Sequence, residues 1–174
     1  MSELIEIPSD SAGLRRAFAH FPSGVVAVCA EIGEVPAGLV VSTFVPVSLD
    51  PPLVSFCVQN SSSTWPKLVG AQRLGLSLLS AHQDEAAQKM SSRTGDRFRD
   101  VELQRGEGGS IFVGGAAAWL EGTVHTQVAA GDHQVVLVQI TRLATRSHHE
   151  PLVFHGSRFR RLHPGAEVAS AEVA

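Results

Sequence analysis

The sequence lacks the features that mark several large classes of protein. It has no tyrosine, only two cysteines, and no apolar run near the roughly 20 residues of a membrane-spanning helix. Cys29 and Cys57 lie far apart in apolar segments without a C-x-x-C or zinc-type spacing, which indicates reduced thiols in a cytoplasmic protein. The acidic N-terminus has no secretory-signal pattern, and a net charge of −3 gives no reason to expect nucleic acid or an anionic membrane as partner.

The common nucleotide and hydrolase motifs are also missing. There is no G-x-G-x-x-G, no G-x-x-x-x-G-K-[ST] and no G-x-S-x-G, which excludes the usual dinucleotide, NTPase and α/β-hydrolase signatures. His148-His149-Glu150 resembles part of H-E-x-x-H, but Val153 stands where the second histidine is needed, and Pro151 would interrupt the helix. We interpret these histidines as loop residues and expect no metal.

The composition predicts one globular domain with a core. The chain has 174 residues, of which 44% are hydrophobic and 18% charged. We expect an N-terminal arm over residues 1–10, a single domain over 11–163, and a disordered tail over 164–174, because the tail is small and acidic.

The hydrophobic pattern predicts many short strands and few helices. Helices are expected over 11–21, 63–70 and 81–91, and a polar surface loop over 94–109. Turn signals separate the strands, and no βαβ alternation occurs, so the pattern favours an antiparallel barrel or sandwich. The predicted strands are 25–30, 38–44, 53–58, 74–79, 111–113, 116–124, 134–143 and 152–154.

Residues 36–64 are the most informative segment. An apolar strand leads to the hydroxyls of Ser42, Thr43 and Ser48, and a second apolar strand ends in the polar turn 59–64. Two strands that end in hydroxyl- and amide-rich loops suit a polar, phosphorylated ring compound. A simpler interpretation remains open, namely that the serines of the turn only cap a short helix.

Four segments of the chain, taken in order, form a recognisable pattern. They are Phe21-Pro22-Ser23-Gly24-Val25, Gly38 to Pro52, Phe56 to Thr64, and Gly131-Asp132-His133 with the later Pro151-Leu152-Val153-Phe154. Together they resemble the flavin reductase-like family, the small reductase components of two-component flavin monooxygenases. The resemblance implies a mainly β fold, a split antiparallel Greek-key β-barrel with a few flanking helices, that forms a homodimer. It implies FMN as the flavin, with FAD also possible. The implied function is an NAD(P)H:flavin oxidoreductase that takes hydride from NADH or NADPH and supplies reduced flavin to a separate monooxygenase.

The resemblance also implies a set of site residues. Strand backbone can bond the edge of the flavin ring, the N–H groups of the turn suit a phosphate, and an arginine can supply the countercharge. His133 is expected beside the nicotinamide, where hydride transfer needs positioning of the two rings. In the alternative interpretation, His133 only begins a strand and hydrogen-bonds nearby backbone. The expected flavin-binding residues are Leu39, Val40, Val41, Ser42, Thr43, Ser48, Gln59, Asn60, Ser61, Ser62, Thr64, Arg93, Arg97 and Phe98.

The chain departs from the family pattern at three hydroxyl positions. Val40 replaces a usual threonine and Val45-Pro46 a usual Thr-Ser, and each lost hydrogen bond to flavin would cost about 0.5–1.5 kcal/mol. Two rival functions therefore stay open: a flavin-binding reductase of another acceptor, and a non-catalytic ligand-binding module. The sequence does not decide between NADH and NADPH or between FMN and FAD, and it does not identify the oxygenase.

Overall fold

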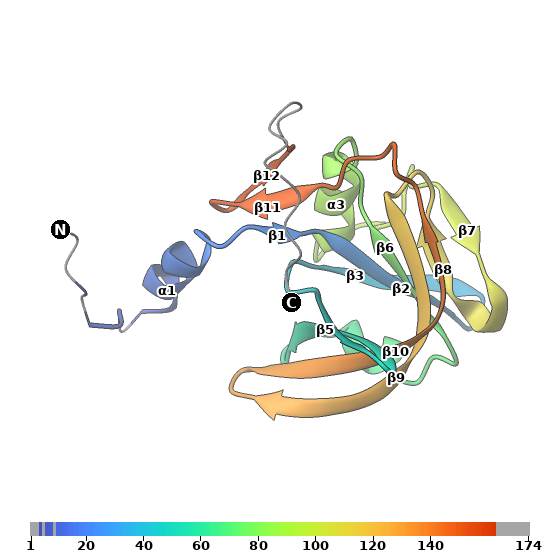
Figure 1. Cartoon of the computed structure of the whole chain (residues 1–174), viewed down its shortest axis with the longest axis horizontal. Helices are drawn as coiled ribbons and strands as arrows, with labels where there is room; N and C mark the ends of the chain where they lie inside the picture. The colour runs from blue at the N-terminus through green and yellow to red at the C-terminus, as the bar shows by residue number, and fades with distance from the viewer. Residues whose placement is uncertain (1–3, 5, 9, 163–174) are drawn as a thin grey trace.

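One curled antiparallel sheet dominates the computed structural model, which describes residues 4, 6–8 and 10–162 (Figure 1). Every neighbouring pair of strands in this sheet is antiparallel, which confirms the expected mainly β, antiparallel fold. In sheet order the strands are β3 (Val35–Val41), β2 (Val26–Ile32), β6 (Leu74–Leu78), β9 (Ala118–Ala130), β10 (His133–Thr145), β5 (Pro52–Gln59) and β4 (Val45–Leu49).

The sheet curls on itself but does not close. β3 stands at one end of the hydrogen-bonding order, and β5 and β4 stand at the other end. The backbone N–H of Cys57, on β5, nevertheless donates to Thr43 Oγ1 at 2.8 Å, so the segment that follows β3 is tied to β5. The result is a split barrel, with a seam between residues 39–43 on one side and 57–64 on the other.

The strands form because their side chains suit a curled sheet with a packed interior. On β5, Val54, Phe56 and Val58 are buried in alternation, as expected for a strand that presents one face to a core. β2 is buried on both faces from Val26 to Ala30. Its second face packs in another apolar cluster, which includes Met90 of helix α3 (Asp84–Ser91). The sheet therefore has a core inside the curl and a second core outside it.

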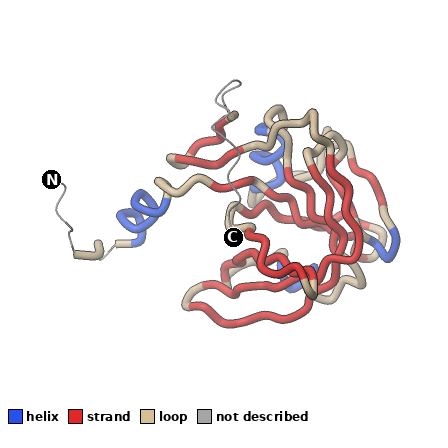
Figure 2. Tube along the Cα trace, viewed as in Figure 1, coloured by secondary structure: helices blue, strands red, loops and turns tan. Residues whose placement is uncertain are grey.

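The short strands and the other helices lie around this sheet, whereas the N-terminal helix, residues 11–18, lies apart from it (Figure 2). Helix α1 begins after Asp10, whose carboxylate accepts a hydrogen bond from the Gly13 N–H at 2.7 Å. None of the helices in the described part of the chain is long and apolar enough to cross a membrane. The remaining elements are α1 (Ser11–Phe18), α2 (Trp65–Leu68), α3 (Asp84–Ser91), the 3-10 helix η1 (Glu107–Gly109), and the strands β1 (Ser23–Gly24), β11 (Val153–His155), β12 (Arg158–Arg160), β7 (Leu103–Arg105) and β8 (Ile111–Val113).

Several expected elements are wrong in extent. The predicted loop 94–109 contains β7, which exists because β8 pairs with it. The segment after β3 contains β4, where Pro46 is accommodated because an edge strand has only one neighbour. The predicted tail over 164–174 lies outside the described residues.

Helix and strand ends also differ from the predictions. All three helices are shorter than expected, with α2 only four residues long. β9 and β10 are longer than expected, and the exposed residues 125–130 of β9 pair with the start of β10 up to His133. Residues 125–127 are polar and 128–130 are apolar, so they show no apolar alternation, and cross-strand pairing extends β9 here.

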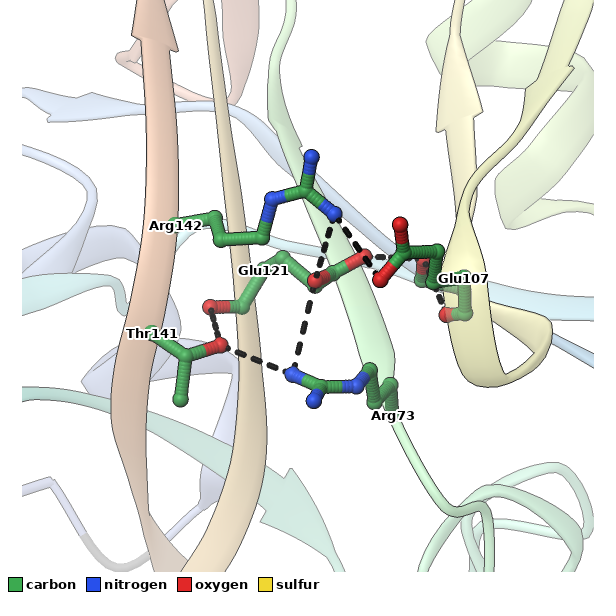
Figure 3. Close-up of polar contacts among 6 residues, drawn as sticks. Arg73, Glu107, Glu121, Thr141 and Arg142 are labelled. Atoms are coloured by element: carbon green, nitrogen blue, oxygen red, sulfur yellow. Dashed lines mark hydrogen bonds and ion pairs between the residues drawn. The ribbon is translucent and has the colours of Figure 1, made fainter.

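One buried carboxylate is built into the sheet. Glu121, on β9, is 3% exposed and accepts hydrogen bonds from Ser110 Oγ at 2.6 Å and from Arg73 Nη1 at 3.4 Å. Arg142 Nη1, on β10, lies 3.9 Å from the same carboxylate and 3.2 Å from that of Glu107 (Figure 3). The cluster joins η1, β9, β10 and the residue before β6, and it supplies the partners that a buried charge needs.

Candidate functional site

A cavity of about 500 Å³ opens in the seam of the barrel. This volume falls within the range of sites that bind small molecules and cofactors. Its walls come from the end of β3, the end of β5 with the turn after it, the end of α3 and the segment after it, and the start of β10. The lining residues are Leu39, Val40, Val41, Ser42, Thr43, Cys57, Val58, Gln59, Ser61, Ser62, Ser63, Thr64, Met90, Ser91, Arg93, Arg97 and His133.

All but three of the residues expected at the site line this cavity. Ser48 lies half-buried on β4, opposite Leu53 of β5. Asn60 is exposed, and its Nδ2 donates to the Gly131 carbonyl at 3.2 Å. Phe98 packs in the outer apolar cluster and lines an adjoining cavity instead.

Five lining residues were not expected from the sequence. Cys57 and Val58 belong to β5 and were interpreted only as part of an apolar strand. Met90 lies in the apolar stripe of α3, which indicated a core position, and Ser91 follows it. Only Ser63 carried a visible signal, because it belongs to the hydroxyl-rich turn. The five unexpected lining residues are Cys57, Val58, Ser63, Met90 and Ser91.

The β3 wall is mainly aliphatic. Leu39, Val40 and Val41 line the cavity in sequence, followed by the hydroxyls of Ser42 and Thr43. The Thr43 hydroxyl already has a structural partner, because it accepts from the Cys57 N–H and lies 3.4 Å from the Cys57 carbonyl. Among the described lining residues there is no phenylalanine or tryptophan, so a flat ring would lie against aliphatic side chains.

The polar turn at the other wall combines capping with free backbone donors. Ser62 Oγ accepts a hydrogen bond at 3.1 Å from the N–H of Trp65, the first residue of α2, whereas the side chain of the N-cap residue Thr64 makes no capping hydrogen bond. The Ser62 N–H donates to the Gln59 carbonyl at 2.9 Å, which closes the turn. None of the hydrogen bonds between described residues uses the N–H groups of Ser61, Ser63 or Thr64.

The two arginines of the cavity give it positive charge. Arg97 Nη1 donates to Thr64 Oγ1 at 2.8 Å and lies 3.4 Å from the Gly38 carbonyl, so it joins the turn to β3. Arg93 lines the same cavity and is exposed. Within the described ranges, neither guanidinium pairs with a carboxylate, and no aspartate or glutamate lines the cavity. The field of this wall therefore favours an anion.

His133 reaches the cavity as the first residue of β10. It stands in register opposite Gln59 of β5 and Ala130 of β9. Its Nδ1 lies 2.7 Å from Asp132 Oδ1. The hydrogen bond to His133, together with the charge of the imidazole, lowers the pKa of Asp132 below its ordinary value. The contact fixes the ring through Nδ1 and leaves Nε2 as its other polar atom.

Fold and site together define a class: an antiparallel split barrel with an anion-attracting, nucleotide-sized cavity in its seam. Residues 18–163 match the model of the flavin reductase like domain, and the chain belongs to that family. The resemblance drawn from the four sequence segments is thereby confirmed.

Individual relatives agree with this assignment. The chain is 34% identical to an NADH-dependent FAD reductase of Streptomyces globisporus, over 98% of this chain and 95% of the relative. The structure of the S. globisporus NADH:FAD oxidoreductase SgcE6, in complex with NAD and FAD fragments, superposes with a TM-score of 0.88 at 35% identity, over 95% of this chain and 100% of that one. BorF, the flavin reductase component of a bacterial two-component tryptophan halogenase, superposes with a TM-score of 0.81 at 30% identity, over 88% and 98%.

Proposed function

We propose that the chain is an NAD(P)H:flavin oxidoreductase that binds flavin in the seam cavity. The observation that carries the proposal is the convergence of three features on one cavity: an aliphatic wall, a donor-rich turn with two arginines, and His133. A flavin has the matching parts, namely a flat apolar ring edged with polar atoms and a ribityl phosphate. The names of the relatives, which specify NADH with FAD, support the same reaction.

The residues of the cavity have separate tasks in this proposal. The aliphatic wall, Leu39 to Val41, packs against the flavin ring, and Ser42 adds a hydroxyl at its edge. The turn N–H groups and Arg97 hold the phosphate, and the hydrogen bond of Arg97 to Thr64 keeps its guanidinium at the turn. α2 is too short for a helix dipole of consequence, so the anion depends on the N–H groups and the arginines.

His133 is proposed to hold the nicotinamide nucleotide. It lines the cavity from β10 and is fixed through Nδ1, so Nε2 can hydrogen-bond the nicotinamide amide or the pyrophosphate. A flavin in the cavity would supply N5 as the hydride acceptor. The part of His133 and the cavity walls would be to hold the nicotinamide and flavin rings about 3–3.5 Å apart, because the transfer needs no proton from the protein at the donor carbon.

The proposal extends to partner, assembly and location. The chain would deliver its reduced flavin to a separate monooxygenase component, as the name of BorF, the flavin reductase component of a halogenase, suggests by analogy.

The chain would also form a homodimer. This dimer would cover Val45, Val47 and Leu49 of the edge strand β4, which are 54%, 51% and 96% exposed. We also propose a cytoplasmic location, which the two free cysteines support. Light scattering of wild type and Val47→Asp tests the dimer, because a charge in the interface should yield monomer.

Consumption of NADH or NADPH by the purified protein, with and without added FMN or FAD, tests the function. We expect turnover that rises and saturates with free flavin. Turnover that does not depend on added flavin, but on another acceptor, would favour a reductase with a resident flavin. No consumption of either nucleotide under any condition would leave a binding module and overturn the proposal.

A further inference from the structure

Arg97, the arginine that is bonded to the turn wall of the seam cavity, is carried by a loop. It lies between α3 and β7, in a segment that forms neither helix nor strand. Its Nη1 nevertheless donates to acceptors on both sides of the seam, to Thr64 Oγ1 at 2.8 Å and to the Gly38 carbonyl at 3.4 Å. An arginine side chain loses much rotamer freedom when it is fixed in one place. Other residues of the loop must therefore hold the backbone from which Arg97 extends.

The residue before Arg97 fixes the backbone of this loop. Asp96 Oδ1 accepts a hydrogen bond from the Phe98 N–H at 3.0 Å, so the aspartate side chain bridges to the backbone two residues further on. The Asp96 carbonyl also accepts from the Arg99 N–H at 3.4 Å. Both bonds close around Arg97, although Asp96 is exposed and does not itself line the seam cavity.

The residue after Arg97 anchors the loop to the core. Phe98 packs against the outer apolar cluster. A Cβ at Gly38 would lie 2.9 Å from Phe98 Cζ, so the glycine allows the phenyl ring to lie directly on β3. The carbonyl of the same glycine is the second acceptor of Arg97. The anchored ring therefore sets the distance between the loop and β3 that the Arg97 side chain has to span.

Arg93 shows what an arginine of this cavity does without such support. It lines the same cavity from the same segment, and it is exposed. Among the described residues, its guanidinium has neither a hydrogen-bond acceptor nor a carboxylate partner. Arg93 adds positive charge to the cavity, whereas Arg97 presents its donors at a fixed place.

We infer that Asp96 and Phe98 are positioning residues, which hold Arg97 at the turn so that the cavity prefers a phosphorylated flavin to riboflavin. The inference rests on the proposed function, because it takes the flavin phosphate to lie at the turn. Neither positioning residue touches the ligand in this arrangement. Each acts through Arg97, whose donors are in place before the phosphate arrives, so that less of the side chain has to be ordered on binding.

Equilibrium binding of FMN and riboflavin to the full chain tests the inference, because the two ligands share the ring and differ in the phosphate. Asp96→Ala removes the acceptor of the Phe98 N–H. It should weaken FMN about three- to tenfold, the range of one lost hydrogen bond, and leave riboflavin unchanged. Asp96→Asn is the matched control, because its side-chain oxygen can still accept that N–H although the charge is gone. Its FMN affinity should equal or exceed that of wild type, since removal of a negative charge by itself favours an anion.

Three further variants test whether the effect passes through Arg97. Phe98→Leu keeps an apolar side chain in the outer cluster but shortens the anchor, so it should weaken FMN by less than Asp96→Ala and spare riboflavin. Arg99→Gln removes an exposed charge from the same loop outside the cavity, and it should change neither affinity. In an Arg97→Gln background, Asp96→Ala should cause no further loss of FMN affinity, because the residue through which it acts is absent.

The contrary outcomes separate the positioning role from the function. Equal weakening of FMN and riboflavin by Asp96→Ala, or no weakening of either, would overturn the positioning role. An Asp96→Asn variant as weak as Asp96→Ala, or a loss that persists in the Arg97→Gln background, would overturn it as well. In each of these cases wild type still binds flavin, and the proposed function stands. Failure of wild type to bind either flavin would instead overturn the proposed function itself.

Discussion

Replacement of the buried carboxylate on β9 tests the energetic reasoning most directly. Glu121→Gln keeps the shape of the side chain and an oxygen that can still accept from Ser110, but it removes the charge. The Ser110 hydroxyl also lies 3.1 Å from the Glu107 carbonyl, so it retains a second acceptor. The substitution therefore isolates the value of the charge in this cluster.

The size of the expected stability loss follows from how buried each hydrogen-bond or ion-pair partner of Glu121 is. A hydrogen bond to a charged acceptor contributes about 1 kcal/mol more than one to a neutral acceptor, and Ser110 is fully buried. The Arg73 pair adds about 0.5–1 kcal/mol, because the Arg73 side chain is 31% exposed and screened by water. Arg142 is 60% exposed and contributes little. We expect Glu121→Gln to lower the free energy of unfolding by about 1.5–2 kcal/mol, which lowers Tm by about 3–8 °C for a chain of this length.

Thermal unfolding followed by circular dichroism, at one protein concentration for all variants, measures this loss. Glu107→Gln is the control, because its carboxylate is 77% exposed and pairs only with Arg142, so its Tm should stay within about 1 °C of wild type. An unchanged or raised Tm for Glu121→Gln would refute the reasoning. It would mean that the desolvation cost of the buried carboxylate equals or exceeds its interaction energy with Ser110, Arg73 and Arg142.

The other predictions concern the seam cavity. His133→Ala should slow NADH oxidation several-fold in stopped-flow assays and leave flavin affinity nearly intact; unchanged turnover would contradict the nicotinamide role. Ser61→Ala combined with Thr64→Ala should weaken FMN more than riboflavin in fluorescence titrations, because only FMN carries the phosphate and because Arg97 loses its Thr64 partner. Equal weakening would mean that the turn does not bind phosphate. A maleimide at pH 7 should label Cys57 and spare Cys29, whose pKa burial raises to about 12, and bound FMN should slow the labelling. Mass spectrometry that finds Cys29 modified in the folded protein would contradict this.

The fold was predictable where the local pattern carries it. The apolar segment 53–58 defined β5, and the helical spacing within 11–21 located α1. β4 and β7 were missed because their pairing is non-local: Pro46 disrupts any strand pattern, and β7 depends on β8. Cross-strand partners, rather than the residues of a segment alone, decide such cases.

The part of the site that lies at strand ends was predictable from the sequence. Residues 39–43 and the turn 59–64 were visible in the sequence, and the structure brings them to one cavity. Met90 is a core residue, 1% exposed in the outer apolar cluster, and it also lines the cavity. An apolar helix position indicates only the core, so its place in the site was not visible in the sequence. The sequence offered Arg93 and Arg97 equally, and only the fold brings the Arg97 guanidinium to Thr64.

Because the seam of the barrel is not closed by strand pairing, a ligand bound there can stabilise the fold. The cavity walls belong to β3 and to β5 with its turn, which the hydrogen-bonding order of the sheet keeps apart. A molecule that contacts both walls therefore links two parts of the sheet that strand pairing does not join. At a concentration one hundred times its Kd, such a ligand stabilises the fold by about 2.7 kcal/mol. If the chain releases its flavin after each turnover, as proposed, it gives up this bridge in every cycle. We then expect its resistance to heat and proteolysis to rise and fall with the supply of flavin.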